Sequence, residues 1–226
     1  MARKQSNIIK TKAQVRILLK AADITREILT NVSKQIKPGS TERDIAKNID
    51  RSIKNRGLRR SFRTIVASGK NAARPHAKPT SRKIKSNDMI VVDLGVIYKD
   101  YHSDMTRTLI IGNISPLMRR LYKTVKTAQK LAIQKIRPGI RISDFVKETH
   151  GYIRKKGFGK YILHSLGHGI GKRIHEAPRL SENNNRILKK GMVVTIEPGL
   201  YIKDRGGIRI EDMVYLGQKK SKVLTA

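Results

Sequence analysis

The chain carries a diverged internal repeat, and this feature constrains its fold more than any other. Lys37-Pro38-Gly39 matches Arg137-Pro138-Gly139 at an offset of 100 residues. At the same offset Asp44 meets Asp144, Ile53 meets Ile153, and Gly57 meets Gly157. Such a repeat indicates that one structural unit is duplicated. We therefore expect two pseudo-symmetric halves, about 13–112 and 113–216, packed as a single α/β domain spanning residues 1–226.

Each half is predicted to begin with two helices. Residues 13–36 place apolar side chains at helical spacing, and the proline at position 38 ends that helix. Thr41 is the expected N-cap of the second helix, and Ser143 is the matching expectation in the second half. Gly57 and Gly157 are expected to end these helices, because a glycine readily adopts the left-handed conformation needed there.

The helices are followed by apolar stretches that are predicted to be buried strands. Residues 89–98 and 192–202 are rich in Val, Ile and Met, and residues 105–111 and 207–216 are expected to be their partner strands. The two halves together are thus expected to form helices and strands around one central site.

Carboxylates stand at unusual places in these apolar stretches. Asp93 lies in Ile-Val-Val-Asp-Leu-Gly, Glu197 lies at the matching place in Val-Val-Thr-Ile-Glu-Pro-Gly, and Glu211 follows Gly-Gly-Ile-Arg-Ile. A buried carboxylate is costly unless it is paired or bound to a metal. One such acid is explained by a buried salt bridge, whereas several, paired across a repeat, indicate a shared positive charge.

Histidines accompany these acids. His164, His168 and His175 fall in one glycine-rich window, and His76 matches His175 across the repeat. Any one of them alone is adequately explained as a solvent-exposed side chain on a turn. The cluster beside the repeated acids instead favours a functional site. Because the chain has no cysteine, a metal here must be held by carboxylate and imidazole groups.

The charge of the chain is strongly positive. Fifty Lys and Arg against 17 Asp and Glu give a formal charge of +33, spread along the whole sequence. This charge has two interpretations. One is contact with RNA or the ribosome, and the other is simply a lysine-rich solvated surface. With three Phe and seven Tyr, no aromatic platform for stacking bases is evident. Weak, salt-sensitive RNA association is compatible with both interpretations.

Segments that target or insert a chain into membranes are not evident in the sequence. No apolar run reaches the roughly 18 residues needed to span a bilayer. Residues 1–6 lack the apolar stretch of a signal peptide. We therefore expect a cytoplasmic protein that does not contact membranes.

The motifs around the acids and histidines resemble the pita-bread metallopeptidase family of creatinases and aminopeptidases, and most closely the catalytic domain of Xaa-Pro aminopeptidase and prolidase. The matching ligand positions, in family order, are Asp93, Asp104 (in Tyr-His-Ser-Asp-Met-Thr-Arg-Thr), His168 (in Gly-His-Gly-Ile-Gly), Glu197 and Glu211. The resemblance covers about residues 13–216. It implies the duplicated α/β fold, with mainly antiparallel strands around a dinuclear metal site. For a site of four carboxylates and one imidazole, Mn²⁺ is expected, with Co²⁺, Fe²⁺ or Zn²⁺ as alternatives.

The resemblance also implies a role for each residue. Asp93 would hold the first metal, Asp104 and Glu211 would bridge both, and His168 and Glu197 would complete the second. A bridging hydroxide would attack the peptide bond, with Glu197 as general base. His76 and His175 would contact the scissile carbonyl, the oxyanion and the leaving group. His164 and Arg209 match substrate-side residues of the proline-specific branch. For Arg209, an ion pair that positions Asp104 or Glu211 is an equal alternative.

The sequence leaves several functions open. An Xaa-Pro peptidase is favoured by the run from Ser68 to His76, by His-Glu-Ala-Pro at 175–178, and by the short separation of Glu197 and Glu211. A methionine aminopeptidase is favoured by length, since the extra N-terminal domain usual in proline-specific relatives is not expected in this chain. A non-catalytic RNA- or ribosome-binding protein on the same fold is the third alternative. A homodimer is expected if subunit contacts replace that domain.

Overall fold

The computed structural model describes residues 8–218 and 220–226, so residues 1–6, with no evident signal peptide, lie outside the described part. The helices are α1 (Lys12–Ser33), α2 (Glu42–Lys54), α3 (Pro116–Lys135) and α4 (Ile142–Lys155), with the 3₁₀ helices η1 (Gly69–Ala73) and η2 (Gly159–Tyr161). The strands are β1 (Arg59–Arg60), β2 (Ile65–Ser68), β3 (Met89–Leu94), β4 (Val96–Tyr98), β5 (Tyr101–His102), β6 (Met105–Ile110), β7 (Gly167–Gly169), β8 (Glu176–Leu180), β9 (Val193–Ile196), β10 (Gly199–Ile202), β11 (Gly206–Arg209), β12 (Asp212–Leu216) and β13 (Ser221–Val223). Among these residues, no helix is both long and apolar enough to cross a membrane.

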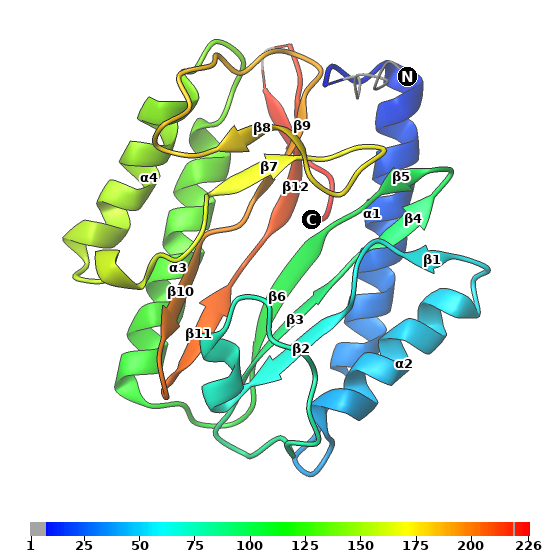
Figure 1. Cartoon of the computed structure of the whole chain (residues 1–226), viewed down its shortest axis with the longest axis vertical. Coiled ribbons are helices and arrows are strands. Elements are labelled where there is room, and N and C mark those ends of the chain that lie inside the picture. Colours follow the sequence, from blue (N-terminus) through cyan, green and yellow to red (C-terminus); the bar gives the residue numbers. More distant parts are fainter. Residues whose placement is uncertain (1–7, 219) are drawn as a thin grey trace, which may run out of the picture.

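The strand topology repeats between the two halves. In the first half β3 pairs antiparallel with β2 and β6, and in the second half β9 pairs antiparallel with β7 and β12. The helices α1 and α2 flank the strands on one side and α3 and α4 on the other (Figure 1). Equivalent strands therefore have equivalent neighbours, which confirms the predicted pita-bread arrangement of two pseudo-symmetric halves.

Each half has an apolar core between its helices and its strands. In the first half Ile49 and Ile53 of α2 share a cluster with Ile90 of β3. In the second, Phe145 of α4 shares a cluster with Val194 of β9. A fully buried side chain of this size contributes about 1.5–3 kcal/mol, so these clusters hold the helices against the strands that carry the acids.

The helix ends agree with the sequence except at the start of α4. The main-chain N–H of Asp44 donates to the Thr41 side chain at 3.1 Å, as expected of an N-cap. Gly57 and Gly157 have positive φ angles of 68° and 83°, as expected after a helix. The expectation for Ser143 was wrong, because it lies inside α4. There the N-terminal N–H of Ile142 is satisfied by the carbonyl of Arg186 instead.

Three stretches that were predicted as single strands are each broken in two. The first breaks at Gly95, where a Cβ atom would lie 1.9 Å from the Ser103 carbonyl oxygen. The second breaks at Glu197 and Pro198, and the third at Ile210 and Glu211. An apolar run does not reveal such breaks, although they release two of the predicted ligands from the regular ladder.

Candidate metal centre

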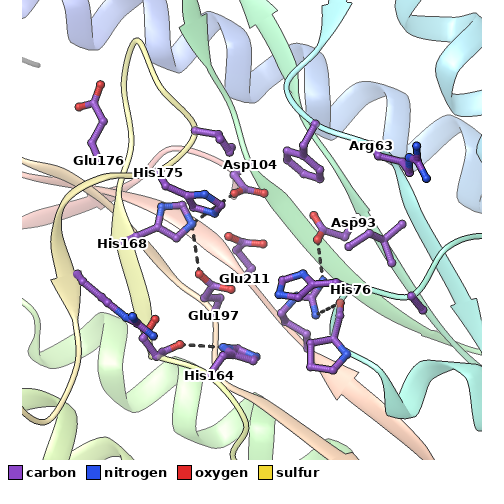
Figure 2. Close-up of a pocket in the computed structure, with 18 of the residues that line it drawn as sticks. Arg63, His76, Asp93, Asp104, His164, His168, His175, Glu176, Glu197 and Glu211 are labelled. Carbon is purple, nitrogen blue, oxygen red and sulfur yellow. Dashed lines mark hydrogen bonds and ion pairs between the residues drawn. The ribbon is translucent and has the colours of Figure 1, made fainter. Parts of the chain in front are cut away.

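Side chains from both halves line one cavity of about 810 Å³ (Figure 2). Asp93 lies on β3, Asp104 directly precedes β6, and His168 lies on β7. Glu197 directly follows β9, and Glu211 lies between β11 and β12. All five predicted ligands line this cavity. Elements from both halves of the chain therefore bring the five groups together, as the repeat predicts.

The closest part of the cluster involves the second-half residues and Asp104. One ligand atom from each of Asp104, His168 and Glu211 lies within 4.8 Å of the other two. The Nε2 atom of His168 is 3.6 Å from Oδ2 of Asp104 and 3.4 Å from Oε1 of Glu197. These separations are those of groups that can share a cation.

The ring of His168 is held in the orientation that a metal ligand requires. Its Nδ1 atom is 3.0 Å from the carbonyl oxygen of Gly169, to which it donates, so Nε2 faces the carboxylates as an acceptor. Burial lowers the pKa of His168 and favours its neutral form. A neutral imidazole with its second nitrogen bonded to a carbonyl is the usual form of a ligating histidine.

The acids of the cluster repel one another. Burial, followed by the charges of Glu211, Asp93 and Glu197, raises the pKa of Asp104 well above its ordinary value. Burial, followed by Glu197 and Asp93, does the same to the pKa of Glu211. Burial also raises the pKa of Glu197. Ionising all of these groups together requires additional positive charge nearby.

The unsatisfied atoms of the site fit bound cations. Of the buried side-chain polar atoms in the described residues, three lack a hydrogen-bond partner, and two of them are Oδ1 of Asp93 and Oε1 of Glu211. A buried carboxylate oxygen without a donor is costly unless a cation occupies its lone pairs. With four carboxylates and one imidazole, the donor set suits a hard to borderline divalent metal.

Arg209 is the cation that the chain itself supplies to this cluster. It is buried, and its Nη2 atom lies 2.6 Å from Oδ2 of Asp93. Its other nitrogens donate to the hydroxyl of Tyr201, the carbonyl of Pro75 and the hydroxyl of Thr106. The geometry thus favours the ion-pair interpretation over a free substrate contact. The carboxylate that Arg209 contacts is Asp93, whereas the sequence interpretation named Asp104 or Glu211.

The remaining histidines border the cavity in different ways. His76 and His175 are exposed in it, and the ring of His175 meets that of His168 edge-on at 4.5 Å between centroids. His164 also lines the cavity, yet both of its ring nitrogens are engaged. Nδ1 donates to the Ser165 carbonyl, and Nε2 accepts from Tyr201, whose hydroxyl already accepts from Arg209.

Two threonines complete the site and were missed by the sequence interpretation. Thr106 donates to Oε2 of Glu211 at 2.6 Å, and Thr195 donates to Oε1 of Glu197 at 3.1 Å. Thr195 also accepts from the main-chain N–H of His168 at 3.0 Å. The sequence spacing could have revealed Thr195 as a neighbour of Glu197, since it lies two residues earlier and alternate residues of a strand face the same side.

Fold and cluster together define a duplicated α/β protein with a cluster of carboxylates and a histidine, suited to holding a metal, where its halves meet. Comparison with known proteins then identifies the family. The model of metallopeptidase family M24 matches residues 16–218, and the chain belongs to this family.

Relatives with known names agree with this assignment. The chain is 40% identical to the Xaa-Pro dipeptidase of Pyrococcus furiosus over 98% of its own length and 64% of the relative's. The solved prolidase from Pyrococcus furiosus superposes with a TM-score of 0.94 at 40% identity, over 97% of this chain and 65% of that one. The X-Pro aminopeptidase from Thermotoga maritima superposes with a TM-score of 0.93 at 34% identity, over 97% and 60%. The chain thus spans slightly less than two thirds of these relatives.

Proposed function

We propose that this protein is a metal-dependent peptidase that hydrolyses the bond before proline in short peptides. The observation that carries the proposal is the convergence of Asp93, Asp104, His168, Glu197 and Glu211 on one cavity. Its proline specificity is supported by the Xaa-Pro dipeptidase and X-Pro aminopeptidase among its relatives.

In this proposal Asp93, Asp104, His168, Glu197 and Glu211 would hold two divalent cations, with Mn²⁺ as the expected metal. When bound, such cations polarise a carbonyl and lower the pKa of a bound water. The protein's part is to fix the ligands. Thr106 orients Glu211, Thr195 orients both Glu197 and His168, and Arg209 orients Asp93.

The residues proposed to act on the substrate lie around this cluster. Glu197 is the proposed proton carrier, since it lines the cavity beside His168 and Asp104 and its Oε1 atom is held by Thr195. His76 and His175 are exposed in the cavity and can donate to the substrate carbonyl or to the leaving nitrogen. His164, with both nitrogens engaged, would contact the substrate through its ring rather than as a donor.

The cavity also offers groups that fit the two parts of an Xaa-Pro dipeptide. Phe62, Ile65 and Ile174 are apolar residues of its lining that a proline ring could contact. Arg63, Lys78 and Arg179 supply cations for a free carboxylate. A dipeptide brings both a proline ring and a free carboxylate into the cavity, whereas in a longer peptide the carboxylate lies further along the chain. This favours a dipeptidase over an aminopeptidase.

The proposal is tested by hydrolysis of Ala-Pro, Ala-Pro-Ala and Met-Ala-Ser with the manganese-loaded protein, using Glu197→Gln as the control. Cleavage before proline that is lost in the variant is the expected result, with Ala-Pro the better substrate. Preference for Ala-Pro-Ala would indicate an aminopeptidase. Release of methionine alone would indicate a methionine aminopeptidase. Absence of hydrolysis with Mn²⁺, Co²⁺, Fe²⁺ and Zn²⁺ would reject the proposal and favour a binding protein.

A further inference from the structure

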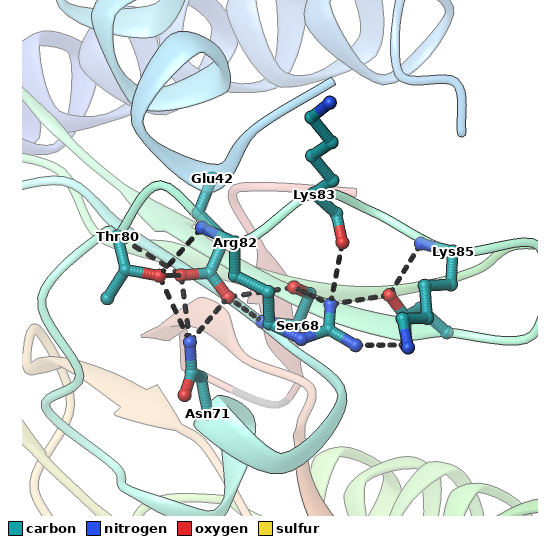
Figure 3. Close-up of polar contacts among 8 residues, drawn as sticks. Glu42, Ser68, Asn71, Thr80, Arg82, Lys83 and Lys85 are labelled. Carbon is teal, nitrogen blue, oxygen red and sulfur yellow. Dashed lines mark hydrogen bonds and ion pairs between the residues drawn. The ribbon is translucent and has the colours of Figure 1, made fainter. Parts of the chain in front are cut away.

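The loop that carries His76 is fastened to α2 by one buried carboxylate. Glu42, in the first turn of α2, is fully buried. Its Oε1 atom accepts from the N–H and the hydroxyl of Ser68, both at 2.7 Å. Its Oε2 atom accepts from the N–H and the hydroxyl of Thr80 at 3.0 and 2.6 Å. Figure 3 shows Glu42 between these two residues, so it joins the beginning and the end of the segment 68–80.

A fifth donor closes this arrangement. The side-chain amide of Asn71, on η1, lies 3.2 and 3.1 Å from the two oxygens of Glu42. Burying a carboxylate is favourable only when donors replace its lost water, and here five donor atoms and the positive end of α2 do so. A fully satisfied buried group of this kind fixes one geometry, because any shift of the loop breaks several charge-assisted bonds together.

An ion pair between Arg82 and Asp88 also contacts the base of this segment. Arg82 binds Asp88 through two contacts of 2.6 and 2.9 Å, and it donates to the hydroxyl of Ser68 at 2.6 Å. The Ser68 hydroxyl therefore accepts from Arg82 and donates to Glu42 (Figure 3). The base of the loop is thus a continuous network, and Glu42 is its central acceptor.

The tip of the loop reaches the metal centre. Pro75, which precedes His76, accepts from Nη1 of Arg209 at 3.1 Å, and Arg209 in turn binds Asp93. The position of His76 relative to Asp93 is therefore set by two attachments. Arg209 holds the tip, and Glu42 holds both ends of the base.

The duplicated half shows that the fold itself does not require this network. The residue that matches Glu42 across the repeat is Ile142, a buried apolar side chain. The residue after His175 is instead held by a buried ion pair of 2.6 Å between Glu176 and Lys10, a residue that precedes α1. The segments that carry the two histidines are thus held by different carboxylates, and the Glu42 network belongs to the segment of His76 alone.

We propose that Glu42 is a positioning residue for His76, acting through Ser68, Asn71 and Thr80. This inference rests on the proposed peptidase function, because its catalytic readout requires turnover. In Glu42→Gln the side chain keeps its shape and loses its charge, and one of its oxygens becomes a donor that faces other donors. The loop then loses its fixed geometry, while all five proposed metal ligands remain.

The test is a double-mutant cycle on Ala-Pro hydrolysis. We expect Glu42→Gln to lower kcat by about 10- to 100-fold in the otherwise unchanged protein, as expected for displacement of a catalytic group by about 1 Å. In a His76→Ala background the same change should alter kcat by less than about twofold, because residues acting as a unit are not additive. In a His175→Ala background the full effect should remain. Equal effects in both backgrounds would overturn the proposal.

Two further measurements separate positioning from general damage. Hydrogen exchange of the Ser68 and Thr80 amides, which needs no turnover, should quicken in Glu42→Gln while the amides of residues 193–196 keep their protection. Metal content should be unchanged. Thr149→Val, which removes a buried hydroxyl bond within α4, is the matched control and should retain wild-type kcat.

The failures can be told apart. If Glu42→Gln does not fold, Thr80→Val tests the same contact with a smaller change and the same expected loss of coupling in His76→Ala. An inactive wild-type protein would reject the peptidase function itself. An active wild-type protein with unchanged exchange at Ser68 and Thr80, or without coupling to His76, would reject the positioning role alone.

Discussion

Replacing Arg209 by methionine tests the electrostatic balance of the metal centre. Arg209 is buried, and it donates to four different groups, with its shortest contact to Asp93 at 2.6 Å. Methionine keeps most of the apolar stem and removes the charge. In the metal-free protein, the carboxylate of Asp93 then remains buried beside other acids without its cation.

The magnitude follows from the state of that carboxylate. Removing one partner of a buried ion pair costs about 3–5 kcal/mol, so the metal-free variant should lose this much unfolding free energy. With metal bound, Asp93 of the variant still has a cation as its partner, at Oδ1, the oxygen that Arg209 does not contact. The remaining loss is of the hydrogen bonds from Arg209 to the neutral groups of Tyr201, Pro75 and Thr106, which costs about 1–3 kcal/mol in total. Metal should therefore reduce the destabilisation by about 2 kcal/mol.

The measurement is urea unfolding of the wild-type protein and Arg209→Met, each with EDTA and with saturating Mn²⁺. Arg82→Met is the matched control, because Arg82 also forms a short ion pair, with Asp88, but away from the cluster. Its destabilisation should be the same with and without metal. An equal loss for Arg209→Met in both conditions would refute the reasoning and would mean that a bound metal does not compensate Asp93 for the loss of Arg209.

Three further predictions follow from the site and the surface. Burial raises the folded-state pKa of Glu211 above its ordinary value of 4.5, so the metal-free protein should be most stabilised by this group below pH 4.5 and should lose that stability as pH rises. Thermal unfolding measured against pH checks this, and Glu211→Gln should lack this part of the pH dependence. Gly167→Ala should cost about 1–3 kcal/mol or more and weaken Mn²⁺ binding by calorimetry, since the new Cβ would lie 2.0 Å from the Thr195 carbonyl oxygen and push β7 from β9. RNA association, which follows from the charge alone, should appear in mobility shifts at low salt, vanish near 0.2 M salt, and weaken in Lys123→Gln/Lys126→Gln on the exposed face of α3.

The repeat was the most reliable source of prediction. It relates the topology of β2, β3 and β6 to that of β7, β9 and β12, because homologous apolar positions need the same neighbours to be buried. Asp93 and Glu197 could be placed at one site for the same reason. Local signals were less reliable where tertiary contacts replaced them, as at Ser143, where the Arg186 carbonyl supplies what a cap would supply.

Contacts between distant residues could not be predicted from the sequence. Glu42 reads as an ordinary first-turn acid of a helix, which is favourable there in any protein. Its actual partners lie 26, 29 and 38 residues further along the chain. Arg209 presented the same difficulty, since nothing local distinguishes Asp93 from Asp104 as its partner. The homodimer and the native metal likewise depend on contacts and ions beyond the chain, and they stay predictions.

The two halves use a symmetric scaffold to build an asymmetric site. Equivalent strands place Asp93 and Glu197 at one site. If the site were fully symmetric, both carboxylates would face only other negative charges. Arg209 breaks this symmetry, because it reaches back from β11 to pair with Asp93. Glu197 has no such guanidinium within ion-pairing distance among the described residues and is bonded to Thr195 instead. One acid is thereby held in a buried ion pair, while the pKa of the other is raised by burial. A duplicated fold can in this way give matching positions two different environments, as the proposed ligand role of Asp93 and the proposed proton-carrier role of Glu197 require.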